Sequence, residues 1–350
     1  MTIKEIAKLA GVSLGTVDRV IHKRGKVSEK TKKKILKILE EVNYKPNLNA
    51  RALVLNKTFS IIALLPSYKK GEYWEMPAKG VLQAAEDYSQ FGLKLEVIYF
   101  DQNISESFIE KAKEVVAKKP DGVILAPVIN FEALKLSIKL KELHIPFSIV
   151  DSNMPNSNPL SFTGQDAYQS GKLGAKLLAT SIKNKGTIAI VSIKSNENYN
   201  QKLQQRIEGF KAYFFESTAI QHINLTEFYI DQRVDKWKDT LKEACSQTDL
   251  VGLFVPSSKV HHAAKITVDL NREVSVVGYD LIDKNLTYLK KGAINYLIGQ
   301  RPENQGYTAF TNFYRHLISK QDFLKEKYIP LDIVTQENIM YYDVEVPQIV

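Results

Sequence analysis

Polar side chains that can bind hydroxyl groups follow several short apolar runs of this sequence. Asp101, Asp151 and Asp280 come directly after three such runs, and Ser257 follows a fourth. If these runs are parallel strands, the side chains gather at one edge of a sheet, where open α/β folds bind their ligands. The same argument adds Tyr68, Phe131 and Asn200, which follow other runs. Carboxylates accept hydrogen bonds from hydroxyls, so the chemistry indicated is the binding of a small polar ligand.

Sequence motifs for catalysis or metal binding are missing. The chain has no Gly-x-Gly-x-x-Gly, no Walker loop, no His-Glu-x-x-His and no Gly-x-Ser-x-Gly. His261 and His262 are adjacent, so on a helix they point apart and make a poor metal pair. We therefore expect no catalytic residues, no metal and no cofactor.

The elements that must position the strand-end residues alternate in type from Phe59 onward. Short apolar runs typical of strands lie at 61–65, 93–100, 122–126, 146–150, 186–193, 225–230, 250–255, 274–279 and 293–298. Helical patterns lie between them, at 74–91, 105–118, 131–143, 168–182 and 201–215. This order predicts an α/β fold, a doubly wound parallel sheet with helices on both faces. Because so many strands exceed one compact half, we expect two similar lobes.

The first 58 residues differ from the rest in charge. They contain 14 Lys and Arg against 5 Asp and Glu, whereas residues 59–350 contain 34 of each kind. Two short amphipathic segments meet at Gly11, and a third begins after Ser28, which predicts a three-helix head with a helix-turn-helix. Lysines line the third segment, where the simpler alternative is a solvated helix face. A basic head on a neutral body indicates a nucleic-acid-binding module.

The second helix of such a head reads base edges with side chains near its amino end. These positions are Leu14, Gly15 and Arg19. Arg19 can pair with guanine through two hydrogen bonds, Leu14 offers only apolar contact, and Gly15 has no side chain to contribute. The other DNA contacts expected in the head are Thr2, Ser13, Thr16 and Lys26. The role of Asp18 is left open, because a carboxylate facing phosphate is repulsive.

The run from Thr2 to Val20 resembles the amino terminus of the lac repressor family of bacterial transcription regulators. Residues 43–47, 50–53 and 57–58 resemble the hinge of that family. The resemblance implies that two hinge helices of a dimer lie in the minor groove of the operator, with Leu53 wedged between base steps. Packing of Leu53 against the large domain is the alternative. The hinge residues expected to contact DNA are Asn47, Ala50, Arg51 and Leu53.

Three segments of the body, 164–178, 206–210 and 274–280, are similar to the same family. The resemblance implies a body of the type I periplasmic-binding-protein fold. The expected domains are a helix-turn-helix head (1–46), a hinge helix (47–58) and an effector-binding and dimerisation domain (59–350). We place the three crossings between lobes near Asn158, Lys291 and Lys325. Lobe 1 is then about 59–159 plus 292–325, and lobe 2 about 160–291 plus 326–350.

By this resemblance Asp280 is the carboxylate that binds the ligand, and Arg206 holds a ligand hydroxyl. Tyr68, Tyr73 and Trp74 are candidates for covering a sugar ring. The alternatives are that Asp280 caps the helix starting at Ile282, that Arg206 forms a surface ion pair, and that Trp74 packs in the core. Ser257 stands where many relatives have Asn, so the pocket need not share their sugar preference.

The function predicted is that of a ligand-responsive transcription regulator, a repressor, which binds a near-palindromic operator as a homodimer and senses a sugar or sugar derivative between the lobes. Cys245 is the single cysteine, which fits a reducing compartment. No apolar run reaches 18 residues and no signal-peptide pattern is present, so we expect a cytoplasmic protein without membrane contact. A solute-binding or chemosensory protein and a two-lobed sugar-processing enzyme remain alternatives, and a purine is the second candidate ligand.

Overall fold

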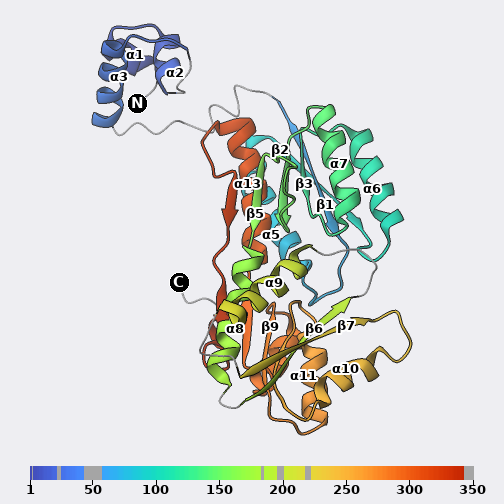
Figure 1. The fold of residues 1–350 in the computed structure, drawn as a ribbon. Coiled ribbons are helices and arrows are strands. Elements are labelled where there is room, and N and C mark those ends of the chain that lie inside the picture. The colour runs from blue at the N-terminus through green and yellow to red at the C-terminus, as the bar shows by residue number, and fades with distance from the viewer. Residues whose placement is uncertain are drawn as a thin grey trace.

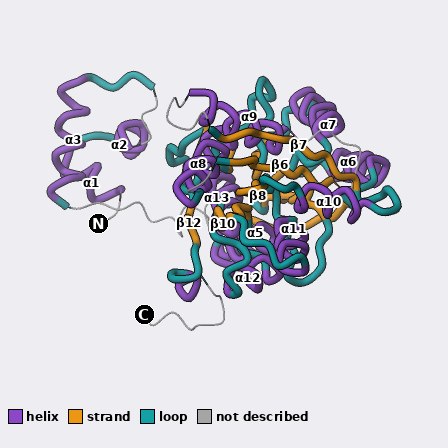
Figure 2. The backbone as a smooth tube through the Cα atoms, turned by 60° about the horizontal axis from the view of Figure 1, so that its bottom comes forward, coloured by secondary structure: helices purple, strands orange, loops and turns teal. Residues whose placement is uncertain are grey.

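The structure is a computed structural model that describes residues 1, 3–21, 25–42, 57–182, 185–194, 201–216 and 222–342. Its head consists of α1 (Ile3–Ala10), α2 (Leu14–Ile21) and α3 (Glu29–Glu41), which form a bundle of their own (Figure 2). The buried core of this bundle comprises Ile6, Ala7, Ala10, Val17, Val20 and Ile35. Leu9 and Leu36 are exposed, because three short helices enclose only a narrow core.

Local signals account for the ends of the head helices. Gly11 follows α1 with a φ of +69°, the left-handed conformation that glycine adopts without strain. Ser13 Oγ accepts a hydrogen bond from Thr16 N at 3.2 Å, and Ser28 Oγ accepts one from Thr31 N at 3.3 Å. Side-chain caps of this kind satisfy backbone donors that the first helical turn leaves free, so the turn between α1 and α2 is fixed by local sequence.

Two six-stranded sheets form the body (Figure 1), and their strands follow equivalent orders. The first has the order β11-β5-β4-β3-β1-β2 and the second β12-β10-β9-β8-β6-β7. Every strand pair is parallel except β10 with β12. The strands of the first sheet are β1 (Phe59–Pro66), β2 (Leu93–Phe100), β3 (Gly122–Leu125), β4 (Phe147–Asp151), β5 (Ser161–Gly164) and β11 (Glu326–Tyr328). Those of the second are β6 (Gly186–Lys194), β7 (Ile223–Asp231), β8 (Leu250–Phe254), β9 (Ser275–Tyr279), β10 (Tyr296–Gly299) and β12 (Asp332–Val334).

Helices cover both faces of each sheet, as the alternation of patterns predicts. Lobe 1 contains α5 (Glu75–Asp87), α6 (Ser105–Lys118), α7 (Asn130–Glu142) and α13 (Pro302–Tyr314), with the short turns Ser89–Phe91 and Arg315–Ser319. Lobe 2 contains α8 (Ala167–Ser181), α9 (Gln201–Glu216), α10 (Trp237–Ser246), α11 (Val260–Asp269), α12 (Asp283–Lys290) and the turn Ile339–Tyr341. The predicted fold, a helix-turn-helix head followed by a two-lobed α/β body, is confirmed.

The chain passes between the lobes after β5, after β10 and after β11. Lobe 1 therefore comprises residues 59–164 and 302–328, and the described part of lobe 2 comprises residues from 167 to 299 and from 332 to 342. The boundaries expected near Asn158, Lys291 and Lys325 put β5, β10 and β11 in the opposite lobes. Periodicity reports that a segment is a strand but not which sheet it joins, and β5 and β11 are too short to give a clear pattern.

A pair of glycines brings two helices into close contact in each lobe. A Cβ on Gly171 of α8 would lie 2.0 Å from the backbone oxygen of Arg206 in α9, and one on Gly209 would lie 2.0 Å from that of Tyr168. Gly80 and Gly306 join α5 to α13 in the same manner. Since no side chain fits between these backbones, the glycines allow α5 to pack directly on α13 and α9 to pack directly on α8. In each lobe, the helix that follows the first strand is held in position by this contact.

Candidate functional site

The surface of the head that is expected to read DNA lies on α2. Val17 and Val20 are buried in the head core, whereas Leu14, Gly15 and Arg19 are exposed. Leu14 is 51% exposed, so its side chain is accessible for apolar contact with another molecule. Of the other expected DNA contacts, Ser13, Thr16 and Lys26 lie near this surface or in the loop before α3. Thr2, Asn47, Ala50, Arg51 and Leu53 lie outside the described residues.

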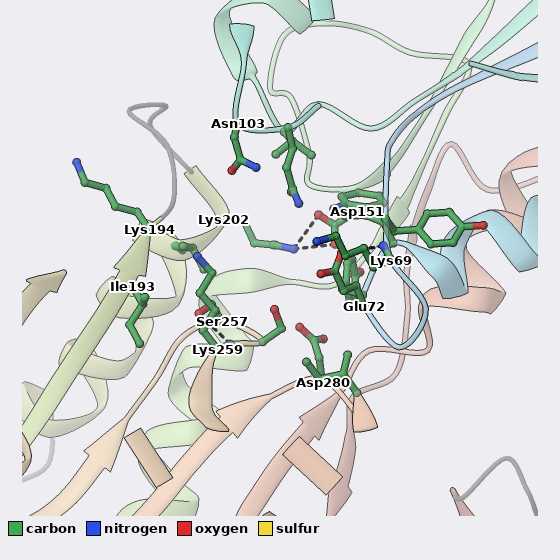
Figure 3. A pocket seen from close by; sticks show the side chains of 18 of the residues that line it. Lys69, Glu72, Asn103, Asp151, Ile193, Lys194, Lys202, Ser257, Lys259 and Asp280 are labelled. Atoms are coloured by element: carbon green, nitrogen blue, oxygen red, sulfur yellow. Dashed lines mark hydrogen bonds and ion pairs between the residues drawn. The ribbon is translucent and has the colours of Figure 1, made fainter. Parts of the chain in front are cut away.

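A cavity of about 870 Å³ lies between the two lobes. Its walls are the segments after β1, β2 and β3 and the end of β4 with the segment after it in lobe 1, and in lobe 2 the end of β6, the segments after β7, β8 and β9, and α9. This is the edge at which parallel α/β sheets bind ligands. Figure 3 shows Asp151 and Asp280 entering the cavity from opposite lobes.

Asp151 and Asp280 occupy equivalent positions in the two lobes. Asp151 ends β4 and Asp280 follows β9, and these strands hold the same place in the two sheet orders. Both residues have a φ of 72°, in the left-handed region, and both are nearly fully buried. Strained backbone of this kind concentrates at functional sites. The two carboxylates are therefore the matched acceptors of the cleft.

Lys202 of α9 bridges the lobes. Its Nζ lies 2.7 Å from both carboxylate oxygens of Asp151, and Tyr73 donates its hydroxyl to Asp151 Oδ1 at 2.6 Å. Burial lowers the pKa of Lys202 even though Asp151 and Asp280 oppose the shift. Burial, with Asp151 as the second cause, holds the pKa of Tyr73 well above its usual value. A ligand that enters the cleft must either join this bridge or replace it.

Arg206 and Asp280 belong to one buried polar network that reaches the lobe crossings. Gln300, between β10 and α13, donates to Asp280 Oδ1 and accepts from Gln165, which lies between β5 and α8, at 2.6 Å. Arg206 donates to the same Gln300 oxygen at 3.5 Å and to the Pro256 carbonyl at 2.6 Å. Within the described part of the chain, Arg206 Nε is buried without a hydrogen-bond partner. Burial raises the pKa of Asp280, against the pull of Arg206 and Lys202.

These contacts decide between the alternatives open at the sequence level. Arg206 is 1% exposed and stacks on the ring of Tyr279, with Cζ 3.6 Å from its centroid, so it is not a surface ion pair. Asp280 does not cap α12, because that helix begins at Asp283 and has Ile282 at its cap position. Trp74 packs in the lobe 1 core and also lines the cavity, so its core packing is shown, and its contact with a sugar ring stays a prediction.

The segment after β8 forms a second polar group on the lobe 2 wall. Lys259 Nζ donates to Gln232 Oε1 at 2.7 Å, and Gln232 Nε2 lies 3.3 Å from His262 Nε2. Burial lowers the pKa of Lys259 to about 8 and that of His262 to about 4. Burial also lowers the pKa of His261, so at neutral pH the two imidazoles are uncharged and Lys259 keeps most of its charge. Among the described residues, no cluster of His, Cys, Asp or Glu has the arrangement of a metal site.

Comparison with known proteins matches both parts of the chain. Residues 2–47 match the model for bacterial regulatory proteins of the lacI family, and residues 62–321 match a periplasmic binding protein domain. This chain belongs to the lacI family. The lacI-family regulator is 28% identical over 289 residues to the ribose operon repressor of Halalkalibacterium halodurans, covering 80% of each chain. It is also 28% identical over 284 residues to the transcriptional regulator DegA of Bacillus subtilis, covering 80% of this chain and 81% of DegA.

Solved structures agree on the fold of the regulator's body. A structure from Bacteroides fragilis, described as a LacI transcriptional regulator, has a TM-score of 0.77 at 29% identity and covers 81% of this chain and 99% of its own. A glucose-galactose binding protein, GanP from Geobacillus stearothermophilus, has a TM-score of 0.69 at 21% identity over 83% of this chain and 99% of its own. No helix in the described ranges of the regulator has the length and apolar character required to cross a membrane.

The cleft of the regulator contains most, but not all, of the predicted effector residues. Its walls include Tyr68, Trp74, Asp101, Asp151, Arg206, Ser257 and Asp280. Phe131 does not line the cavity; it is 68% exposed on α7, with Lys135 over its ring. Asn200 lies outside the described residues. The sequence prediction missed Lys202, Lys259 and Gln300, because each looks like an ordinary surface residue until the fold brings the lobes together.

Proposed function

We propose that this lacI-family regulator binds a near-palindromic operator as a homodimer in the cytoplasm and that a small sugar-like effector in the cleft controls this binding. The supporting observation is the position of Gln300, which binds Asp280 and Arg206 and lies where the chain passes between the lobes. A ligand that engages Asp280 and Arg206 therefore acts on the groups that set the angle between the lobes. In a dimer this angle controls the spacing of the two heads, and so the affinity for two half-sites.

A sugar effector is favoured by the chemistry of the cleft. Asp151 and Asp280 offer acceptors, Lys202 and Arg206 offer donors, and the rings of Tyr73 and Trp74 pack edge to face beside them. Paired donors and acceptors next to aromatic faces suit a ring that carries several hydroxyls. Relatives named as ribose operon repressors, from Halalkalibacterium halodurans and Lactococcus lactis, support the same class.

A homodimer is supported by an apolar stripe on α7 of lobe 1. Phe131, Leu134 and Ile138 are 68%, 40% and 51% exposed and recur at helical spacing, so they share one face of the helix. An exposed apolar face of this kind marks a protein interface, and a second copy presenting the same stripe would cover it by two-fold symmetry. Sedimentation of Ile138→Asp tests the proposal: a dimer that persists unchanged assigns the interface elsewhere.

The head supports direct reading by few base contacts. Arg19 and Leu14 are exposed side chains of α2 that can contact bases, and we propose that the hinge supplies further specificity through Leu53. Leu53→Ala should then weaken specific binding far more than non-specific binding. Equal losses on operator and random DNA would remove the wedge.

The test of the proposed function begins with selection of binding sites from random or genomic DNA at about 150 mM salt, where non-specific binding is weak. We expect enrichment of a two-fold symmetric site, and a change in its affinity when the effector is added. A protein without site preference would overturn the proposal. A solute-binding protein would share the cleft but not the DNA preference, and an enzyme would convert candidate sugars, which this regulator should leave unchanged.

A further inference from the structure

The walls of the cleft carry more positive charge than a neutral sugar requires. The lining cations are Lys69, Lys70, Lys194, Lys202, Arg206, Lys259 and Lys284, and the lining acids are Glu72, Asp101, Asp151 and Asp280. Lys202 is paired with Asp151, and Arg206 shares a network with Asp280. Lys194 pairs with Asp231, which lies outside the lining, at 3.7 Å. Lys69, Lys70, Lys259 and Lys284 then remain beside two acids, Glu72 and Asp101. Because residues 59–350 are neutral as a whole, this excess is a property of the cleft and not of the body.

Lys259 is held by the fold more firmly than the other cleft lysines that have no acid of the lining as a partner. It is partly buried, its Nζ is held by Gln232 Oε1 at 2.7 Å, and it immediately precedes α11, a helix of 10 residues. The backbone at a helix amino terminus also favours negative charge. Burial lowers the pKa of Lys259 to about 8, although the nearby Asp231 carboxylate opposes the shift. The protein thus keeps a desolvated ammonium group at the wall of a cavity, an arrangement that an incoming anion relieves.

The cavity has room for a ligand with two chemically different ends. Its volume of about 870 Å³ lies near the upper limit of the roughly 300–1,000 Å³ typical of small-molecule sites. Asp280 and Arg206 form a wall suited to hydroxyls, whereas Lys259 and Ser257 come from the separate segment after β8. Figure 3 shows Ser257 and Lys259 beside the cavity at a different place from Asp280.

We propose that the effector is a sugar derivative that carries an acidic group, a phosphate or a carboxylate, and that this group binds Lys259 at the start of α11 while the hydroxyls bind Asp280 and Arg206. The inference rests on the proposed function, since it names the chemical class of the ligand sensed in the same cleft. An ammonium donating to an oxyanion forms a charge-assisted hydrogen bond, which is stronger than one between neutral groups.

Matched ligand sets test this inference on the full-length protein. Calorimetry with glucose, glucose 6-phosphate and glucuronate, and with ribose and ribose 5-phosphate, compares each neutral sugar with its own acids. We expect at least one acid to bind about tenfold or more tightly than its parent, with an affinity that falls as salt is added. The phosphate and the carboxylate members separate the two sources of negative charge. A neutral parent that binds as tightly as its acids, or no binding by any acid, would overturn the inference.

Variants of α11 supply the second arm. Lys259→Met should weaken the acidic ligand about tenfold or more and leave its neutral parent unaffected, and Lys259→Gln should do the same if folding of the first variant is in doubt. Lys265→Met is the matched control, because Lys265 lies on the same helix, is 61% exposed and pairs with Asp269 outside the cavity lining. Unchanged acid affinity in both Lys259 variants refutes the assignment. If a neutral sugar releases the protein from operator DNA, the inference of an acidic effector is also refuted, but the proposed function stands. If no ligand of the sets changes operator binding, that result counts against both the inference and the proposed function.

Discussion

The ion pair between Lys202 and Asp151 is expected to hold the lobes together before any ligand binds. Lys202 Nζ lies 2.7 Å from both carboxylate oxygens of Asp151, and the side chains of Lys202 and Asp151 are only 11% and 5% exposed. Two unit charges about 4 Å apart attract by about 4 kcal/mol at an effective dielectric constant of 20. Burial of the ammonium offsets part of this, as the lowered pKa of Lys202 indicates. A coupling free energy of about 1–3 kcal/mol is therefore expected.

A double-mutant cycle measures this coupling. Lys202→Met and Asp151→Asn, alone and together, are compared by urea unfolding of the ligand-free protein. Trp74 in lobe 1 and Trp237 in lobe 2, the two tryptophans of the chain, report on the two lobes by fluorescence. Small-angle scattering should also show a larger radius of gyration for Lys202→Met, because the lobes open when the bridge is lost.

The matched control is the pair Lys265 and Asp269, which lies within α11 at 2.6 Å but is 61% and 56% exposed. The same cycle on this pair should give no more than about 0.5 kcal/mol, because solvent screens exposed ion pairs. If the Lys202 cycle gives a coupling as small as the control, and the scattering is unchanged, the interlobe bridge does not stabilise the closed form and the reasoning fails.

Three further outcomes follow from burial and close packing. Gly171→Ala should lower the free energy of unfolding by about 1–3 kcal/mol, since the added Cβ would lie 2.0 Å from the Arg206 backbone oxygen. If urea titration gave the same free energy of unfolding for the variant and the wild type, α8 and α9 would be able to move apart without cost. Cys245 is fully buried, and burial raises its pKa to about 12, so iodoacetamide at pH 8 should label it only after unfolding. Mass spectrometry detects the label, and rapid labelling of the native protein would contradict this prediction. The pKa of Lys259 is about 8 in the folded protein, below the value of roughly 10.4 in the unfolded chain. Burying the charged ammonium therefore destabilises the folded state by its full amount below pH 8, and this destabilisation fades as the pH rises toward the unfolded pKa. Lys259→Met should consequently stabilise the protein by up to about 3 kcal/mol at pH 7, with the difference gone near pH 10.5; a constant difference across this range would rule out the linkage.

Sequence patterns predicted the parts of this protein that local physics determines. The three head helices follow from apolar spacing, Gly11 and the serine caps, and Asp151 and Asp280 follow from their positions at strand ends. The short strands β5, β11 and β12 were not foreseen, because segments of four and three residues show too little alternation. Lys202 was missed for another reason: its role exists only because α9 of one lobe meets β4 of the other.

The placement of Gln300 has a consequence for how the regulator exchanges information with DNA. This one amide contacts Asp280 and Arg206, the groups proposed to bind the effector, and lies where the lobes join. Under the proposed function, ligand occupancy and lobe angle are therefore two measures of a single state. Thermodynamic reciprocity then requires operator DNA to change the affinity for the effector by the same factor by which the effector changes the affinity for DNA. Operator DNA thus acts as a ligand that sets the effector concentration needed for a response. Protein molecules bound at the operator respond at a different effector concentration from those that are free.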